Sequence, residues 1–136
     1  MSEQLTLEQV QELVTRAPFH KWLGLKVIAV HDDGIEIKAT WREEWVVNVD
    51  RRFTHGGILA ALIDLGADWA MVRKLGRGVP TIDMRVDYHA VVLPGDLTIK
   101  GKIKPVIDKV LPLEQAAEGL RLIQDREIFG KVVVTP

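Results

Sequence analysis

The feature that most constrains this chain is an apolar stretch from Ile58 to about Lys74, which has the length of a helix and almost no polar side. The acidic residues of this stretch are Asp64 and Asp68, one helical turn apart. A helix that is apolar nearly all round belongs in the interior of a fold, wrapped by other elements. The sequence Leu75-Gly76-Arg77-Gly78 is typical of a helix end. We therefore expect the rest of the fold to be built around this central helix.

The segments on either side of the central helix predict an antiparallel sheet. Thr6 and Gln9 have the spacing of a capping box and begin a helical pattern that Pro18 ends, and an apolar connector closed by Gly24 follows. Alternating or β-rich runs around the turn signals Asp33-Gly34 and Pro94-Gly95-Asp96 then predict two hairpins, formed by residues 25–30 with 35–41 and by residues 81–89 with 97–103.

The last part of the chain changes character. Pro112-Leu113-Glu114 begins another helical pattern, and residues 131–134 read as a terminal strand. The predicted apolar face of this helix carries Leu113, Ala116, Ala117, Leu120 and Ile123. The order helix, hairpin, buried helix, hairpin, helix, strand predicts the α+β class, with an antiparallel sheet against a helix.

Composition excludes several classes of function. The chain has 136 residues, 47% of them hydrophobic, and a net charge of −1, which is typical of a globular protein without affinity for nucleic acid. It has no cysteine, so a disulfide, a Cys-ligated metal and a Cys nucleophile are excluded. The histidines have no metal-binding spacing, and we expect neither a metal nor a cofactor. The N-terminus does not resemble a signal peptide, and the longest apolar run, Ile58–Ile63, is too short to span a bilayer, which predicts a cytoplasmic protein without a membrane partner.

Two features of the central helix could carry chemistry. Asp64 lies in apolar surroundings, where an unpaired charge is expensive. It is either a functional carboxylate, or a helix residue that emerges at a gap in the sheet or pairs with an arginine. Asp68 on the same face would raise the proton affinity of Asp64, or it lies in a surface patch. His55-Gly56-Gly57 opens the helix, and glycines there leave backbone N–H groups uncovered for a ligand oxygen, or simply permit a tight turn.

The spacing of these features predicts an assembly. Gly57 and Asp64 are seven residues apart, which is about 10 Å along one helix. One carbonyl carbon cannot contact both groups. If both act on one substrate, they come from two copies of the helix, so we expect a homodimer with a shared site, which could pair further into a homotetramer.

The run from Phe53 to Asp64 resembles the HGG motif of hotdog-fold acyl-CoA thioesterases, in the branch that includes the phenylacetate-pathway enzymes. Residues 80–89, the Pro94-Gly95-Asp96 turn and residues 18–25 also resemble this family, so that the similarity covers about residues 6–104. The resemblance implies a long central helix wrapped by a curved antiparallel sheet.

The resemblance also implies roles for particular residues. Asp64 stands where the family has its catalytic acid, a nucleophile or a general base for water, and Gly57 where a backbone N–H polarises the thioester carbonyl. Asn48 is near an upstream polar residue that contacts the thioester or the water, although its spacing to His55 is one residue longer than usual. Thr81 is near a Ser or Thr that holds the water. The implied substrate contacts are His55, Gly56, Asn48, Thr81 and Asp68.

The end of the chain departs from that family. Residues 105–119 and 129–134 resemble instead the C-terminal tail of zinc-type alcohol dehydrogenases and quinone oxidoreductases, without their cofactor and metal residues. We therefore expect a hotdog body over residues 1–104 and an atypical helix–strand tail over residues 105–136, packed on the same domain. The tail could complete the sheet or leave an edge open.

The expected function is hydrolysis of an acyl-CoA-type thioester at a homodimer interface. A non-catalytic acyl-CoA binding module and a structural oligomer are the alternatives. Aromatic side chains that could line an acyl pocket, or simply pack in the core, are Trp41, Trp45, Trp69 and Tyr88.

Overall fold

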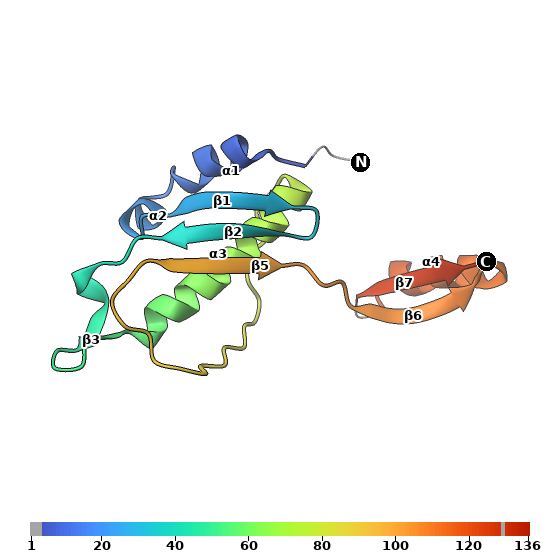
Figure 1. Cartoon of the computed structure of the whole chain (residues 1–136). Coiled ribbons are helices and arrows are strands. Elements are labelled where there is room, and N and C mark those ends of the chain that lie inside the picture. The colour runs from blue at the N-terminus through green and yellow to red at the C-terminus, as the bar shows by residue number, and fades with distance from the viewer. Residues whose placement is uncertain (1–3, 129) are drawn as a thin grey trace. The chain divides into compact units, whose positions relative to one another are not determined.

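The computed structural model describes residues 4–128 and 130–136. The chain divides into two compact units, Met1–Ile103 and Lys104–Pro136. Figure 1 shows the elements of each unit. Although α3 (Gly56–Leu75) has 20 residues, the described parts of the chain contain no helix that is both long and apolar enough to cross a membrane.

Unit 1 begins with two short helices. α1 (Leu7–Val14) is capped by Thr6 and Gln9 through the predicted capping box. The expected connector after Pro18 is in fact a helix, α2 (Pro18–Trp22), which has the proline at its first position. Proline is favoured there because its fixed φ suits a helix and its missing N–H would have no partner within the helix. The prediction of a connector was therefore wrong, and Pro18 starts an element rather than ending one.

The first hairpin is confirmed. β1 (Lys26–His31) pairs antiparallel with β2 (Gly34–Ala39), and β2 pairs antiparallel with β5 (Leu97–Lys102), which gives the sheet order β1-β2-β5. Between β2 and α3 the chain forms a 3-10 turn, η1 (Glu43–Trp45), and a small ladder of β3 (Val46–Asn48) with β4 (Phe53–Thr54).

The central helix α3 lies against this sheet (Figure 1). Its contact with β5 is very close, because a Cβ at Gly66 would lie 2.3 Å from the Ile99 side chain and one at Gly101 would lie 2.1 Å from the Gly66 oxygen. The helix ends at Gly76, whose φ of +68° is the left-handed conformation that favours glycine. The core that the helix shares with the sheet includes Val10, Val14, Leu23, Val27, Ile35, Ile37, Ala39, Trp45, Leu62, Trp69 and Ala70.

The predicted burial of α3 on all sides holds for one face of the helix. Leu62, Gly66 and Trp69 are buried, whereas Ile63 is 44% exposed and Asp64 is half-buried. Ile63 lines a cleft together with residues 87–90 and is not covered by a strand, since the segment that was expected to form one does not join the sheet.

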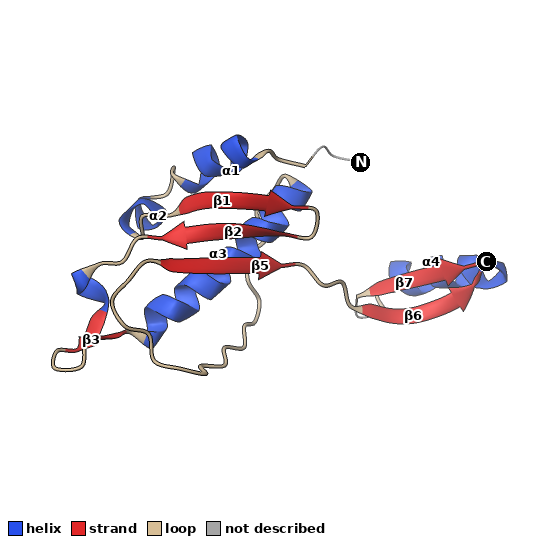
Figure 2. Cartoon of the chain, viewed as in Figure 1, coloured by secondary structure: helices blue, strands red, loops and turns tan. Residues whose placement is uncertain are grey.

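The second hairpin was predicted wrongly. Residues 77–96, all of them described, form no strand, and β5 pairs with β2 instead of with residues 81–89 (Figure 2). Ile82 and Tyr88 are 101% and 56% exposed. The ladder with β2 uses one edge of β5, over six residue pairs. Residues 81–89 do not pair with the other edge, since Thr81 and Tyr88 hydrogen-bond to Asp64 and Gly56 of α3 instead.

Unit 2 is a small β-α-β arrangement. β6 (Ile107–Pro112), which the sequence pattern did not predict, pairs in parallel with β7 (Lys131–Thr135), and η2 (Leu113–Gln115) and α4 (Ala116–Gln124) connect them. The predicted apolar face of α4 was correct only in part: Ala116, Leu120 and Ile123 line a pocket with Val132 and Val134 of β7. The buried positions are nevertheless Gly119 and Leu122, whereas Leu113, Leu120 and Ile123 are exposed. Gly119 packs closely on β7, where a Cβ would lie 3.1 Å from Val132, and this contact sets which side of α4 faces the strands.

Candidate active site

The start of α3 is held by the residue before it. The His55 backbone N–H donates to the Trp45 carbonyl at 2.7 Å, and the His55 carbonyl accepts from the Ile58 N–H at 3.0 Å. The His55 side chain is the N-cap, because its Nδ1 accepts a hydrogen bond from the Gly57 N–H at 2.8 Å. From the sequence, His55 is more readily interpreted as orienting the turn by hydrogen bonding than as a base, and this geometry agrees with that interpretation.

Gly56 is contacted from the segment that follows α3. The Tyr88 hydroxyl donates to the Gly56 carbonyl at 2.9 Å, and the tyrosine ring lies 3.6 Å from where a Gly56 Cβ would be. Both glycines thus lie at a partly exposed helix start, under one exposed aromatic ring and one exposed imidazole. The positive end of the helix dipole adds to the attraction of this place for a ligand oxygen.

Asp64 has a defined partner. The Thr81 hydroxyl donates to Asp64 Oδ1 at 2.7 Å, which joins the middle of α3 to the loop behind it. The two side chains share a cavity of about 410 Å³. Its lining consists of Asp64, Leu65, Asp68, Gly78, Val79, Pro80 and Thr81. Three of the predicted site residues, Asp64, Asp68 and Thr81, line this cavity together, and Asp64 keeps one carboxylate oxygen that Thr81 does not bind.

Asp68 lies one turn further along α3, in the same cavity. Burial raises the pKa of the Asp68 carboxyl above its usual value, and the charge of Asp64 raises it further, whereas the Val79 N–H bond and the nearby His20 lower it. Asp68 therefore holds its proton to a higher pH than an ordinary aspartate. Two neighbouring carboxyls in different environments, Asp64 bonded to a hydroxyl and Asp68 with a raised pKa, are an arrangement that can divide the roles of base and acid.

A single chain does not bring Gly57 and Asp64 together. Both lie on the uninterrupted helix α3, seven residues apart, which separates them by about 10 Å along its axis. The cavity at Asp64 is lined by neither Gly57 nor His55.

Asn48 has a local role in this structure. Its Oδ1 accepts the Arg51 N–H at 2.7 Å and its carbonyl accepts the Arg52 N–H, so that it holds the turn between β3 and β4. It is exposed and does not line the cavity at Asp64. Its predicted contact with substrate stays a prediction.

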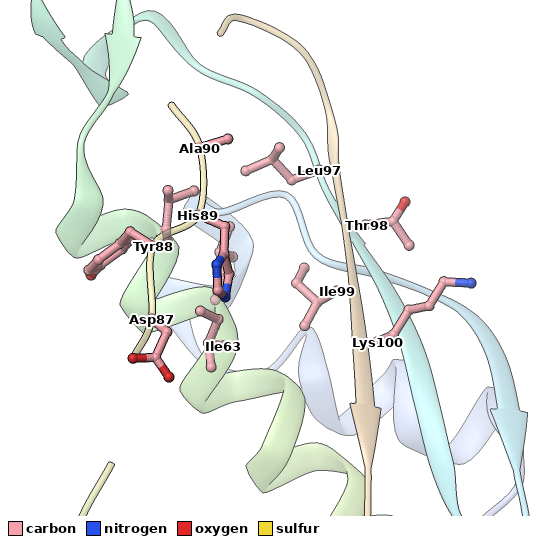
Figure 3. Close-up of a pocket in the computed structure, with 11 residues that line it drawn as sticks. Ile63, Asp87, Tyr88, His89, Ala90, Leu97, Thr98, Ile99 and Lys100 are labelled. Carbon is pink, nitrogen blue, oxygen red and sulfur yellow. The ribbon is translucent and has the colours of Figure 1, made fainter. Parts of the chain in front are cut away.

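A second, more apolar cleft of about 350 Å³ lies between α3 and β5 (Figure 3). Leu97 and Ile99 project from β5 toward it, whereas Thr98 and Lys100 project to the other side of the strand. Residues 87–90 form the opposite wall. The cleft contains neither Asp64 nor Gly57, the two residues that were predicted to be catalytic. We therefore take the cavity at Asp64 as the candidate active site.

The sequence pattern missed the roles of Tyr88, Val79 and His20. The alternation of residues 81–89 placed Tyr88 on a buried strand face, whereas it covers the start of α3. A tyrosine hydroxyl needs a hydrogen-bond partner, but no sequence signal identified the Gly56 carbonyl as that partner. The backbone N–H of Val79 carries no sequence signal at all.

Comparisons with known proteins identify the fold. A solved protein from the thioesterase superfamily is 48% identical, covers 68% of this chain and 70% of its own, and superposes with a TM-score of 0.65. A thioesterase from Haemophilus influenzae has the same fold, at 23% identity, 71% and 66% coverage and a TM-score of 0.60. A protein from Shewanella oneidensis related to the thioesterase superfamily, at 28% identity, covers 68% of this chain and 71% of its own, with a TM-score of 0.50. The predicted α+β hotdog fold is thereby confirmed.

The C-terminal part has different relatives. A family described as zinc-binding dehydrogenase matches residues 54–134, more than half of the chain. An acryloyl-coenzyme A reductase from Sulfurisphaera tokodaii is 40% identical over 60 residues, which are 40% of this chain and 18% of the reductase. The chain therefore belongs to two families, the thioesterase superfamily through its body and the zinc-binding dehydrogenase family over residues 54–134.

The residues present do not fit a zinc site. Within residues 4–128 and 130–136 no group of three or more His, Asp or Glu side chains could hold a metal ion, and the sequence has no cysteine. The zinc chemistry that the family description implies therefore has no ligand set in the part of the chain that the structure describes.

Proposed function

We propose that this protein hydrolyses an acyl-CoA-type thioester, as the HGG branch of the thioesterase superfamily is expected to do. The observation that carries the proposal is the 2.7 Å hydrogen bond from Thr81 to Asp64, which orients a half-buried carboxylate in a cavity of about 410 Å³. Membership of the thioesterase superfamily supports the same reaction class.

The chemistry needs a base or nucleophile and a donor for the developing oxyanion. In the first route, Asp64 takes a proton from a water whose oxygen attacks the thioester carbon; the C–S bond then breaks and the thiolate leaves and is protonated. In the second route, the Asp64 carboxylate attacks the carbon and expels the thiolate, and water hydrolyses the resulting anhydride. In both, the Gly57 N–H stabilises the negative carbonyl oxygen.

The distance along α3 requires two copies of the chain for this reaction. A separation of about 10 Å between Gly57 and Asp64 is too long for one carbonyl group to contact both. A homodimer in which Asp64 of one copy faces Gly57 of the other satisfies the chemistry, and such dimers could pair into tetramers. His55, Gly56, Asn48 and Asp68 are the proposed substrate contacts, and we place the reaction in the cytoplasm.

Replacement of Asp64 tests the proposal. We expect Asp64→Asn to lower kcat by about a hundredfold to ten-thousandfold on a panel of acyl-CoA thioesters, measured by release of free thiol, because a catalytic base or nucleophile is lost. Asp83→Asn, at an exposed position of the following segment, is the matched control and should retain activity. Unchanged turnover in Asp64→Asn would end the assignment.

One observation favours a second candidate, a non-catalytic acyl-CoA binding module. The Gly57 N–H donates to His55 Nδ1 in this structure, so it is not directed at a substrate carbonyl. Saturable binding of CoA esters to the wild-type protein without thiol release would select this alternative.

A further inference from the structure

A second carboxyl lies in the cavity at Asp64. Asp68 is four residues further along α3, so the two side chains project from the same face of the helix, and both line the cavity of about 410 Å³. Side chains at this spacing have Cβ atoms about 5–6 Å apart. The carbonyl carbon of a thioester and the sulfur bonded to it can lie between two groups at that separation, so that each group contacts one of the two atoms.

The two carboxyls are held by different donors from one segment. The Thr81 hydroxyl donates to Asp64 Oδ1 at 2.7 Å, whereas the backbone N–H of Val79 donates to the carboxyl of Asp68. An N–H group can only donate, so the Asp68 oxygen that it binds is an acceptor, and the proton of a neutral Asp68 is carried by the other oxygen. The bond to Val79 therefore fixes the Asp68 carboxyl without using its proton.

The charged groups that face Asp68 are Asp64 on the same helix and His20 from α2. Burial, which has the largest effect, and the negative charge of Asp64 raise the pKa of Asp68, and together they outweigh the lowering by the Val79 N–H and by His20. His20 Nδ1 lies 3.0 Å from the Val14 carbonyl oxygen, which can only accept, so this nitrogen carries a hydrogen. Asp68 is therefore a carboxyl whose surroundings favour its protonated form.

Hydrolysis of a thioester releases a thiolate that needs a proton. An alkyl thiol such as a cysteine side chain has a pKa of about 8.5, so its thiolate leaves more readily at neutral pH when an acid protonates the sulfur as the C–S bond breaks. Asp64 supplies the base or the nucleophile of the proposed reaction and cannot be the acid in the same step. A second group with a proton is needed within reach of the sulfur.

We infer, on the basis of the proposed function, that Asp68 is the general acid that protonates the thiolate sulfur as the C–S bond of the thioester breaks. The O–H bond of Asp68 breaks, the S–H bond forms, and Asp68 is left as a carboxylate. When Asp64 has taken a proton from the attacking water, that proton passes to Asp68 and restores both groups. When Asp64 is the nucleophile, the Asp68 carboxylate takes a proton from the water that hydrolyses the anhydride. The protons balance in both routes.

The need for an acid depends on the leaving group, which gives a direct test. Wild type and Asp68→Asn are compared on an acyl-CoA and on the S-(4-nitrophenyl) thioester of the same acid, whose aryl thiolate is stable without a proton at neutral pH. Asparagine keeps an oxygen that can accept the Val79 N–H but has no acidic proton. We expect kcat of Asp68→Asn to fall about a hundredfold on the acyl-CoA and less than about threefold on the aryl thioester. An equal fall on both substrates would overturn the inference.

The pH profile of kcat on the acyl-CoA decides the same question without the aryl substrate. We expect kcat of the wild type to fall at alkaline pH as Asp68 loses its proton, and this fall to be absent from Asp68→Asn, whose activity is low throughout. Asp83→Asn, at an exposed position, is the control and should keep the wild-type profile and the wild-type kcat on both substrates. The same alkaline fall in Asp68→Asn as in the wild type would overturn the inference.

Failure of this inference is distinguishable from failure of the proposed function. If the wild type releases thiol from acyl-CoA and Asp64→Asn does not, but Asp68→Asn loses no activity or loses it equally on both thioesters, the inference fails and the proposed function stands. If the wild type releases thiol from no acyl-CoA, both fail.

Discussion

Residues 82–88 and residues 97–102 have the same alternation of apolar and polar side chains, yet β5 forms a strand from the second segment and the first forms none. Ile82 is 101% exposed, whereas Ile99 is packed against the core of unit 1. The same alternating pattern thus forms a strand after the Pro94-Gly95-Asp96 turn and an irregular segment before it.

The two segments are held by different interactions. β5 has a continuous ladder to β2, and Gly101 allows it to lie directly on Gly66 of α3. The segment from 77 to 96 is held by separate hydrogen bonds instead. They join Val79 to Asp68, Thr81 to Asp64, Tyr88 to Gly56 and the Thr54 N–H to the Val92 carbonyl.

The comparison shows that an alternation of apolar and polar residues predicts which side chains share one face of a strand. It does not predict whether a neighbouring strand is available to pair with it. A strand forms where a neighbouring backbone offers hydrogen bonds in register. The apolar cleft between β5 and residues 87–90 (Figure 3) shows that, among the described residues, nothing fills the space between the two segments. The separate hydrogen bonds to α3 leave Thr81 beside Asp64, where the proposed chemistry needs it.

The largest expected effect comes from breaking the packing of β5. Gly101→Val would place a side chain 2.1 Å from the Gly66 carbonyl oxygen, which is backbone and cannot move aside cheaply. We expect a loss of about 3 kcal/mol or more in the free energy of unfolding, measured by urea denaturation. Gly78→Val is the matched control, because a Cβ there meets nothing within 4 Å. Equal stability of the two variants would contradict the close helix–strand contact.

The next effect comes from releasing the segment at Asp64. Thr81→Val keeps the shape of the side chain and removes the hydroxyl that donates to Asp64 Oδ1. We expect kcat for thioester hydrolysis to fall about tenfold with little change in stability, since one hydrogen bond to a carboxylate is lost. Thr98→Val on the exposed side of β5 is the control. A tenfold fall of kcat in Thr98→Val as well would show that the loss of activity does not come from the hydrogen bond between Thr81 and Asp64.

The third prediction concerns Asp68, the carboxyl that accepts the Val79 N–H and whose pKa is raised. Burial and the Asp64 charge raise the pKa of Asp68 in the folded protein, so the stability that its protonated form provides is full below the pKa of the unfolded chain. This stability is lost as the pH rises through the raised, folded pKa. We expect Asp68→Asn to remove this loss, so that the variant becomes more stable relative to wild type as the pH rises, measured by thermal unfolding across pH. An unchanged difference across that window would contradict the raised pKa, and Asp83→Asn should show no such trend.

The smallest expected effect on stability comes from substitution of Ile82, an exposed apolar residue of the segment 77–96. Ile82→Lys should change the free energy of unfolding by less than about 0.5 kcal/mol, because the side chain has no neighbours to lose. Ile99→Lys, at the matching position of β5, should be strongly destabilising because it buries a charge in the core. A large loss of unfolding free energy in Ile82→Lys would mean that another copy of the chain covers the Ile82 side chain in solution.

Much of the fold could be predicted from local signals. The capping box of Thr6 and Gln9, the Asp33-Gly34 hairpin, and the helix that starts after His55 and stops at Gly76 all depend on residues within one turn of each other. The helix at Pro18 and strand β6 were missed, and the packed side of α4 was predicted only in part. Each of these depends on what packs against the element, such as Val132 against Gly119.

For the candidate site, the sequence identified Asp64, Asp68 and Thr81, which the structure brings to one cavity. It also identified the glycines at the helix start and predicted hydrogen bonding by His55 there, but it identified neither Gly57 as the partner of His55 nor the bond from Tyr88 to Gly56. Those bonds join residues 2 and 32 positions apart, and the longer one depends on the path of an irregular segment.

The sequence by itself determined where the helices and turns begin and end, because caps, glycines and prolines act on the backbone within a few residues. It also determined that a carboxylate lies within an apolar helix that begins at two glycines. The tertiary structure decided which alternating run becomes a strand and which backbone N–H is already bound, since both depend on hydrogen bonds between residues whose neighbourhood exists only in the folded chain.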